Sequence, residues 1–121
     1  MKKKILVVED DKILQEVIKK SLTEAKFEVV VADDGEDGLK KVILEKPDLI
    51  LLDLLMPKKS GWLVLKELKG NKETKDIPVL VLTVHTSSTS IAECTSLGAK
   101  GYFIKSEYTL DEIIEKINSL I

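Results

Sequence analysis

The sequence predicts a single α/β domain in which a parallel sheet is covered by helices on both faces. Its 121 residues suffice for one domain, and 44% apolar with 33% charged residues is the composition of a soluble globular protein. Short apolar runs alternate with amphipathic segments along the chain. Five such runs alternating with five helical segments predict a doubly wound five-stranded sheet.

The strands are expected where every position is apolar, because strands of a parallel sheet are buried on both faces. The first strand is the β-branched run Ile5-Leu6-Val7-Val8. The most apolar run ends just before Asp53 and is expected to be central. The predicted strands are 5–8, 27–31, 48–52, 79–82 and 101–104.

The helices are expected where apolar residues recur at three- and four-residue spacing. They are predicted over 12–25, from the turn 33–35 to Pro47, from the loop 57–61 to Gly70, over 87–97 up to Gly98, and over 109–120. Thr109 and Glu112 form the capping-box pattern at the start of the last helix. The expected buried faces are Ile13, Leu14, Val17, Ile18 and Leu22; Leu39, Val42 and Ile43; Leu63, Leu65 and Leu68; and Ile113, Ile114, Ile117 and Leu120.

Composition excludes several classes of function. The formal net charge of −2 leaves no basic excess to neutralise nucleic-acid phosphates, so no direct nucleic-acid binding is expected. No stretch approaches the roughly 20 apolar residues of a membrane span. The single cysteine, Cys94, cannot form an internal disulfide and is expected in the core. A cytoplasmic location is therefore expected.

The ends of the predicted strands carry the residues of chemical interest. In a parallel sheet these ends meet at one edge, where ligands bind. Two carboxylates about 4 Å apart repel by roughly 4 kcal/mol at an effective dielectric near 20, so a cluster of them calls for a divalent cation. Mg²⁺ prefers such oxygen ligands. The strands end in Glu9-Asp10-Asp11, Asp53, Thr83 and Lys105.

These residue types suit phosphoryl transfer to a carboxylate. A carboxylate can attack phosphorus and carry the group as an acyl phosphate, while the protein positions the reactants and neutralises charge. Asp53 is the expected nucleophile and Asp10 the metal ligand, with Glu9 holding a metal-bound water. Lys105 and Thr83 are expected to bind the phosphoryl oxygens. Asp11 is expected to be the N-cap of the following helix.

Over essentially the whole chain, 1–121, the sequence resembles a response regulator receiver domain of two-component signalling, of the single-domain chemotaxis-regulator type. The matching segments are ILVVEDD at 5–11, PDLILLDLLMPKKSGW at 47–62, VLVLT at 79–83 and GAKGYFIK at 98–105. The resemblance implies a flavodoxin-like (βα)5 fold with strand order 2-1-3-4-5.

The resemblance also implies a role for each matching residue. Asp53 falls on the phosphoacceptor and Lys105 on the family's lysine. Glu9 and Asp10 fall on the acidic pair that binds Mg²⁺ or Mn²⁺ together with Asp53, and the backbone carbonyl of Leu55 falls on a further metal ligand. The switch residues fall on Thr83 and Tyr102, although Tyr102 also fits a half-buried strand aromatic.

The implied partners are a sensor histidine kinase, whose phosphohistidine donates to Asp53, or a phosphotransfer protein. A downstream protein would bind the face built from 87–97, 101–104 and 109–120. The domain would be a monomer or a weak phosphorylation-dependent dimer. It would catalyse only its own phosphorylation and dephosphorylation, so it is not expected to be an enzyme with a separate substrate.

The chain departs from the family pattern near the proposed acceptor. Ser106 replaces the usual proline, so a trans peptide bond is expected there. Val84 replaces a small residue and could crowd the phosphoryl group. Leu55 and His85 occupy positions that tune the access of water, and the apolar Leu55 predicts a phosphorylated state that is not especially short-lived.

These departures leave open a pseudo-receiver, an interaction module that does not use phosphate. An aspartate-nucleophile phosphatase is disfavoured, because Leu55 stands where its second carboxylate would be. A flavin protein of the same fold is disfavoured too, because the acidic run 9–11 would repel a phosphate.

Overall fold

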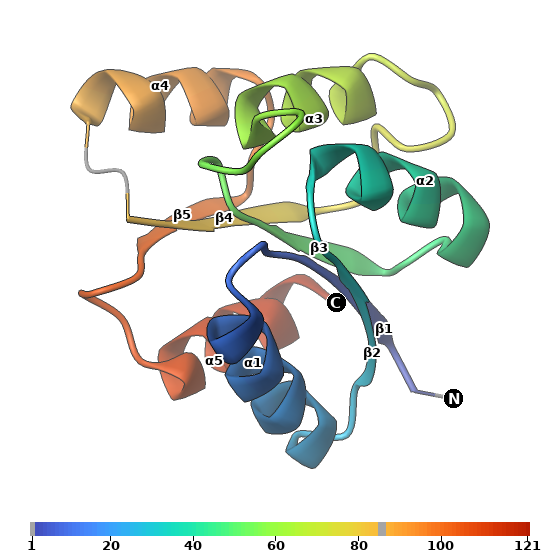
Figure 1. The fold of residues 1–121 in the computed structure, drawn as a ribbon, viewed down its shortest axis with the longest axis vertical. Coiled ribbons are helices and arrows are strands. Elements are labelled where there is room, and N and C mark those ends of the chain that lie inside the picture. Colours follow the sequence, from blue (N-terminus) through green and yellow to red (C-terminus); the bar gives the residue numbers. More distant parts are fainter. Residues whose placement is uncertain (1, 85–86) are drawn as a thin grey trace.

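The computed structural model describes residues 2–84 and 87–121 and contains the predicted sheet and helices (Figure 1). All strand pairings are parallel, in the order β2-β1-β3-β4-β5, which confirms the predicted topology. The strands are β1 (Lys4–Val8), β2 (Glu28–Ala32), β3 (Leu49–Leu52), β4 (Val79–Thr83) and β5 (Gly101–Ile104). The helices are α1 (Lys12–Glu24), α2 (Gly35–Glu45), α3 (Gly61–Lys69), α4 (Ser88–Ser96) and α5 (Leu110–Leu120).

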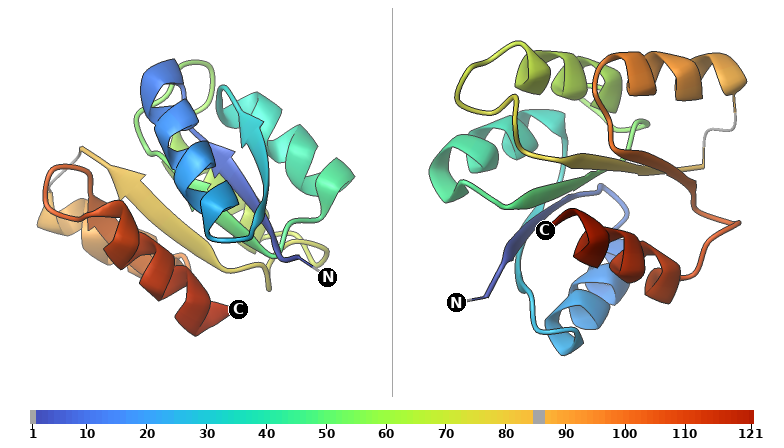
Figure 2. Two further views of the ribbon diagram at one scale, coloured as in Figure 1. Left: turned by 90° about the horizontal axis from the view of Figure 1, so that it is seen from below. Right: turned by 180° about the vertical axis from the view of Figure 1, so that it is seen from behind.

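The helices cover the sheet in two layers, with α1 and α5 on one face and α2, α3 and α4 on the other (Figures 1 and 2). Alternate strand residues supply the two resulting cores. Leu6 and Ile50 pack toward α3 and α4, whereas Ile5 and Leu49 pack toward α1 and α5. The central strands β1, β3 and β4 are buried except at Lys4, and they support the residues that follow them.

Side-chain caps begin the helices where the sequence places polar residues. The Asp11 side chain accepts hydrogen bonds from the backbone N–H groups of Ile13 and Leu14, which confirms its predicted capping role. The capping box of Thr109 and Glu112 is also present. Gly98 follows α4 with φ of +101°, the left-handed conformation that ends a helix.

The predicted buried faces of three helices were too wide. Ile13 is 80% exposed, and Val17, Ile43 and Leu63 are about half exposed. The fully buried stripe of α1 is formed by residues 15, 18 and 22, and Leu14 packs at its edge, so Ile13 and Val17 face outward. Gln15 is buried within that stripe because its amide finds hydrogen-bond acceptors there.

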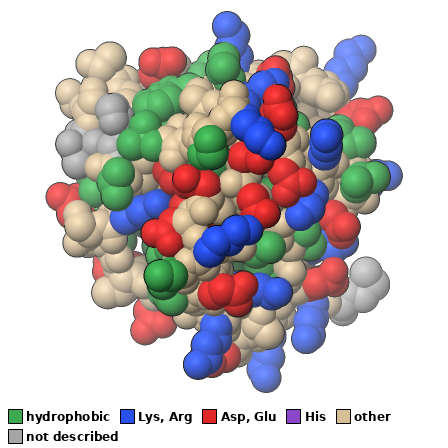
Figure 3. Space-filling model, viewed as in Figure 1, with side chains coloured by type: hydrophobic (Ala, Val, Ile, Leu, Met, Phe, Trp, Pro, Cys, Tyr) green, Lys and Arg blue, Asp and Glu red, His purple; other side chains and the backbone are tan. Residues whose placement is uncertain are grey.

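The surface agrees with the near-zero net charge. Basic and acidic side chains intermingle on the face shown in Figure 3. Among residues 2–84 and 87–121, no helix has the length and apolar character needed to cross a membrane. The expectation for His85 concerns a position outside the described residues.

Candidate functional site

Three carboxylates meet at the carboxyl ends of the central strands, as predicted. Glu9 and Asp10 follow β1, and Asp53 follows β3. One carboxylate oxygen from each lies within 4.8 Å of the other two. Glu9 and Asp53 are buried, whereas Asp10 is exposed at the mouth of the site.

Backbone pairing with β1 and its neighbours places two of these acids, Glu9 and Asp53. The N–H of Glu9 donates to the Ala32 carbonyl at 3.0 Å, and the N–H of Asp53 donates to the Val8 carbonyl at 3.1 Å. These two bonds extend the hydrogen-bond ladders between β1 and β2 and between β1 and β3 by one residue. Glu9 and Asp53 are thus positioned by the sheet itself, not by flexible loops.

Lys105 joins the cluster from the end of β5. Its ammonium nitrogen lies 2.7 Å from Oε1 of Glu9 and 3.2 Å from Oδ2 of Asp53. The Lys105 N–H also donates to the carbonyl of Thr83, which holds the residue against the end of β4. One ammonium against three carboxylates leaves the cluster with a formal charge of −2 when all are ionised.

Burial and charge act against each other at this site. Burial raises the pKa of the Glu9 carboxyl, and the Asp53 charge raises it further, while the Lys105 ammonium and the Asp11 N–H lower it in part. Burial lowers the pKa of Lys105, but hydrogen bonding to Glu9 and the charge of Asp53 outweigh it, so that pKa is raised overall. The ammonium is therefore charged at neutral pH and offsets part of the repulsion.

The donor set fits a hard divalent cation. Carboxylate oxygens from Glu9, Asp10 and Asp53 converge, and the remaining negative charge gives a cation a favourable field. Leu55 donates its N–H to Oδ1 of Asp53 at 3.3 Å, which orients that carboxylate. The predicted use of the Leu55 carbonyl as a ligand stays a prediction.

The loop after Asp53 folds back over the backbone of Asp53 and Leu54. The N–H of Gly61 donates to the Leu54 carbonyl at 2.9 Å. A Cβ on Gly61 would lie 2.2 Å from the Asp53 carbonyl oxygen, so only glycine fits. The sequence showed Gly61 as a loop residue but gave no sign of this close contact.

The two predicted switch residues lie on β4 and β5. Thr83 is fully buried at the end of β4, the strand beside β3. Tyr102 is half-buried on β5, and its hydroxyl oxygen lies 3.3 Å from Oγ of Ser90 on α4. Their roles as switches stay predictions.

Two departures from the family pattern can be checked in the structure. The side chain of Val84 is 59% exposed. No cis peptide bond occurs among the described residues, which agrees with the trans bond expected at Ser106.

Gln15 supports the site and was not singled out from the sequence. Its side-chain amide donates to the Glu9 carbonyl at 2.9 Å and to Oδ1 of Asp33 at 3.0 Å. A signal was present, because Gln15 shares the three- and four-residue spacing of Ile18 and Leu22. A polar residue on a buried stripe indicates a specific hydrogen-bonding role.

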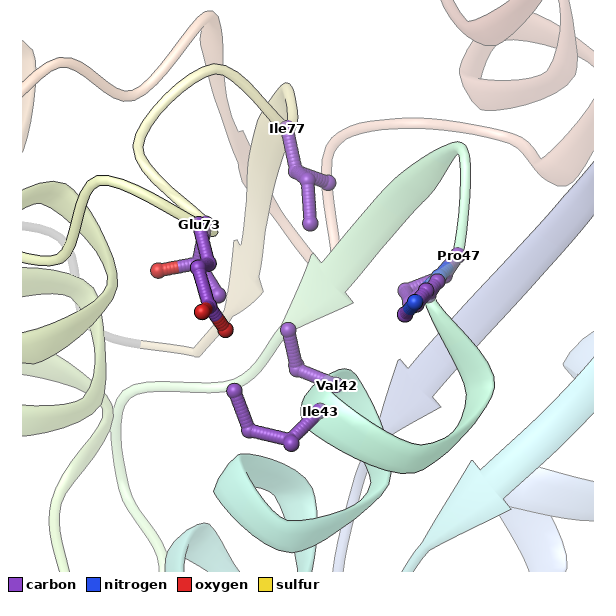
Figure 4. Close-up of a pocket in the computed structure, with 7 residues that line it drawn as sticks. Val42, Ile43, Pro47, Glu73 and Ile77 are labelled. Atoms are coloured by element: carbon purple, nitrogen blue, oxygen red, sulfur yellow. The ribbon is translucent and has the colours of Figure 1, made fainter.

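A separate pocket lies at the other end of the sheet, because Pro47 in its wall precedes β3 whereas Asp53 follows that strand (Figure 4). Its volume is about 440 Å³. The side chains of Val42, Ile43 and Ile77 make it mainly apolar, and Glu73 lies at its wall. It shares no residue with the acidic cluster.

Several protein families share this sheet order, and comparison with known proteins identifies the family of this chain. The family model of the response regulator receiver domain matches residues 5–118. The chain belongs to this family. Within this receiver domain, the acidic cluster of Glu9, Asp10 and Asp53 could hold a metal ion.

Individual relatives agree with this assignment. The receiver domain is 39% identical over 105 residues to the alkaline phosphatase synthesis transcriptional regulatory protein PhoP of Bacillus subtilis, covering 87% of this chain and 43% of PhoP. The chemotaxis protein CheY4 of Vibrio cholerae aligns with a TM-score of 0.91 at 26% identity, over 100% of both chains. The Mn²⁺-bound form of the response regulator Rcp1 aligns with a TM-score of 0.84 at 33% identity, over 97% of this chain and 92% of that one.

The chain spans about half the length of the curated relatives it matches, 51% for one group and 43% for PhoP. The match to CheY4, by contrast, covers both chains completely.

Proposed function

We propose that the receiver domain accepts a phosphoryl group on Asp53 from the phosphohistidine of a histidine kinase or phosphotransfer protein. The observation that carries this proposal is the grouping of the Asp53 carboxylate with Glu9, Asp10 and Lys105 at one edge of the sheet. A buried carboxylate with a fixed ammonium beside it is suited to receive a dianionic group.

Two hydrogen bonds hold the Asp53 carboxylate in a defined orientation. Oδ2 accepts from Lys105 and Oδ1 accepts from the N–H of Leu55. In the transfer, a carboxylate oxygen forms a bond to phosphorus while the bond from phosphorus to the histidine nitrogen breaks. The electron pair of that bond returns to the imidazole, and the product is an acyl phosphate on Asp53. The Lys105 ammonium then balances part of the added negative charge.

Mg²⁺ or Mn²⁺ is the cation we expect at this site. Glu9, Asp10 and Asp53 would hold it, together with the backbone carbonyl of Leu55. When bound, the cation supplies positive charge that offsets the oxygens of the incoming phosphoryl group. The Mn²⁺-bound structure of Rcp1, a relative of the same fold, supports this expectation.

The output of the modification would be a change in a protein-binding surface. Contacts from the phosphoryl group to Thr83 and Lys105 would favour one arrangement of the face formed by α4, β5 and α5, and Tyr102 would move with it. A downstream protein would recognise that face. The chain would act in the cytoplasm and would catalyse only its own phosphorylation and dephosphorylation.

Intact-mass analysis after treatment with acetyl phosphate and Mg²⁺ tests the proposal. The wild-type protein should gain one phosphoryl group, and Asp53→Asn should gain none. Asp11→Asn is the matched control, because Asp11 caps α1 and should leave labelling unchanged. Equal uptake by Asp53→Asn and the wild type would disprove the acceptor assignment, and no uptake by the wild type would favour the pseudo-receiver.

A further inference from the structure

A chain of polar contacts connects three elements beside the acidic cluster. The indole N–H of Trp62, on α3, donates to Oγ of Ser90, on α4, at 3.1 Å. The same Ser90 oxygen lies 3.3 Å from the hydroxyl of Tyr102 on β5. Ser90 is only 5% exposed, so this hydroxyl is a buried junction between three elements. Figure 1 shows α3 and α4 next to each other on the same face of the sheet.

Trp62 is anchored to the acceptor by the backbone. It directly follows Gly61, whose N–H donates to the Leu54 carbonyl. A Cβ on Gly61 would lie only 2.2 Å from the Asp53 carbonyl oxygen, so the two backbones are in close contact. The indole also packs against the buried residues of the core on this face. A displacement of the backbone at Asp53 or Leu54 must therefore move the start of α3, and the indole with it.

The first turn of α4 belongs to a helix whose sequence gives it little intrinsic stability. Its sequence, STSIAECTS, is rich in serine and threonine, which are weak helix formers. Within α4, only Ser90 and Cys94 are buried. The bond from Trp62 to the buried Ser90 is therefore one of the contacts that position this turn against the rest of the molecule.

We propose that Trp62 is a positioning residue that couples the loop after Asp53 to α4 and to the Tyr102 hydroxyl through Ser90. This inference rests on the proposed phosphorylation of Asp53. A phosphoryl group there would shift the loop, and the indole would carry that shift to α4 in addition to any effect passing through Thr83. Trp62 and Ser90 take no part in the proposed transfer to Asp53, so both are assigned a role through position alone.

The resting protein offers the first test. Trp62 is the only tryptophan of the chain, so its indole N–H gives a single NMR resonance. Ser90→Ala should shift this resonance and speed its hydrogen exchange at least fivefold. Ser88→Ala, an exposed serine of the same helix, should leave it unchanged. An indole resonance that is unaffected by Ser90→Ala would overturn the proposal.

The second test measures how strongly phosphorylation of Asp53 changes the environment of α4. Acetyl phosphate and Mg²⁺ are added to the wild type, Trp62→Phe, Ser90→Ala and the double variant, and the amide shifts of α4 are compared with the phosphorylated fraction from intact mass. Each single variant should be phosphorylated fully but show at most half of the wild-type α4 shift, and the double variant should show no further loss. Full phosphorylation with an undiminished α4 shift, or additive losses in the double variant, would overturn the coupling. Absence of phosphorylation in the wild type would instead overturn the proposed function, and this inference with it.

Discussion

The ammonium of Lys105 lies closer to Glu9, at 2.7 Å, than to the proposed acceptor Asp53, at 3.2 Å. The fixed positive charge therefore lies mainly beside Glu9, one of the three acids that could hold a metal ion. A cation that binds Glu9 would release Lys105 toward Asp53 and toward a group attached to it.

Lys105→Met should strongly destabilise the metal-free protein. Removing one partner leaves buried carboxylates without compensation, which costs about 3 kcal/mol in comparable sites. Mg²⁺ should restore part of this loss, because it replaces the missing positive charge. Urea unfolding with and without Mg²⁺ measures both effects.

Lys58→Met is the control for that experiment. Lys58 pairs with Asp34 at 3.6 Å but its side chain is 62% exposed, so its loss should cost less than about 1 kcal/mol. Equal losses for the two variants would contradict the structural role given to Lys105.

Mg²⁺ should raise the melting temperature, and Asp10→Asn should remove most of that rise. A ligand at 100 times its Kd stabilises the folded state by about 2.7 kcal/mol. Asp10→Asn also relieves repulsion within the cluster, but Asp10 is exposed to solvent, so the metal-free protein should gain less than about 0.5 kcal/mol. Asp11→Asn is the control, because asparagine caps a helix as well as aspartate does. Thermal unfolding across a Mg²⁺ titration measures the rise in melting temperature of each variant. An equal rise for Asp10→Asn and Asp11→Asn would argue against a ligand role for Asp10.

Much of the site could be predicted because it depends on the sheet. Uniformly apolar runs identify buried parallel strands, and their shared edge brings Glu9, Asp53 and Lys105 together without any knowledge of side-chain packing. Features that depend on tertiary contacts could not be predicted in the same way. The exposed Ile13 satisfies the helical spacing as well as Ile18 does, and only contact with the sheet separates the two. The bond between Trp62 and Ser90 joins residues that are 28 apart in the chain, and no local pattern connects them.

Asp53→Asn should stabilise the metal-free protein by about 1 kcal/mol. The change removes the repulsion of Asp53 by Glu9 and by Asp10, and it removes one attraction, that to Lys105. The asparagine oxygen can still accept from Leu55. Saturating Mg²⁺ should reverse the order and make the wild type the more stable of the two. Asp76→Asn, at an exposed position, should shift stability by less than about 0.5 kcal/mol. Destabilisation of the metal-free protein by Asp53→Asn would show that attraction to Lys105 outweighs the repulsion.

Gly61→Ala should displace the loop after Asp53. The added methyl would lie 2.2 Å from the Asp53 carbonyl oxygen, which is backbone and cannot rotate away. Overpacking of this kind costs about 1–3 kcal/mol, and we also expect slower labelling by acetyl phosphate. Gly70→Ala is the matched control, because its nearest atom is 3.3 Å away, and its effect should stay within about 0.5 kcal/mol. Equal unfolding midpoints for both variants would contradict the close approach.

Gln15 should control the acid titration of Asp33. The hydrogen bond from the Gln15 amide is the largest influence that lowers the pKa of Asp33, followed by the one from Lys12. Because the folded-state pKa lies below the unfolded value, the resulting stabilisation is present above the unfolded pKa and is lost as the pH falls through the folded one. Gln15→Met keeps the volume of the side chain but removes its donor, so the pKa of Asp33 should rise toward its ordinary value. NMR titration of the Asp33 carboxyl carbon measures this change. Asp34 serves as the internal control, since an N–H of Asp37 is the main cause of its lowered pKa and does not involve Gln15. A variant in which Asp33 keeps its wild-type midpoint, or in which Asp34 moves equally, would refute the assignment.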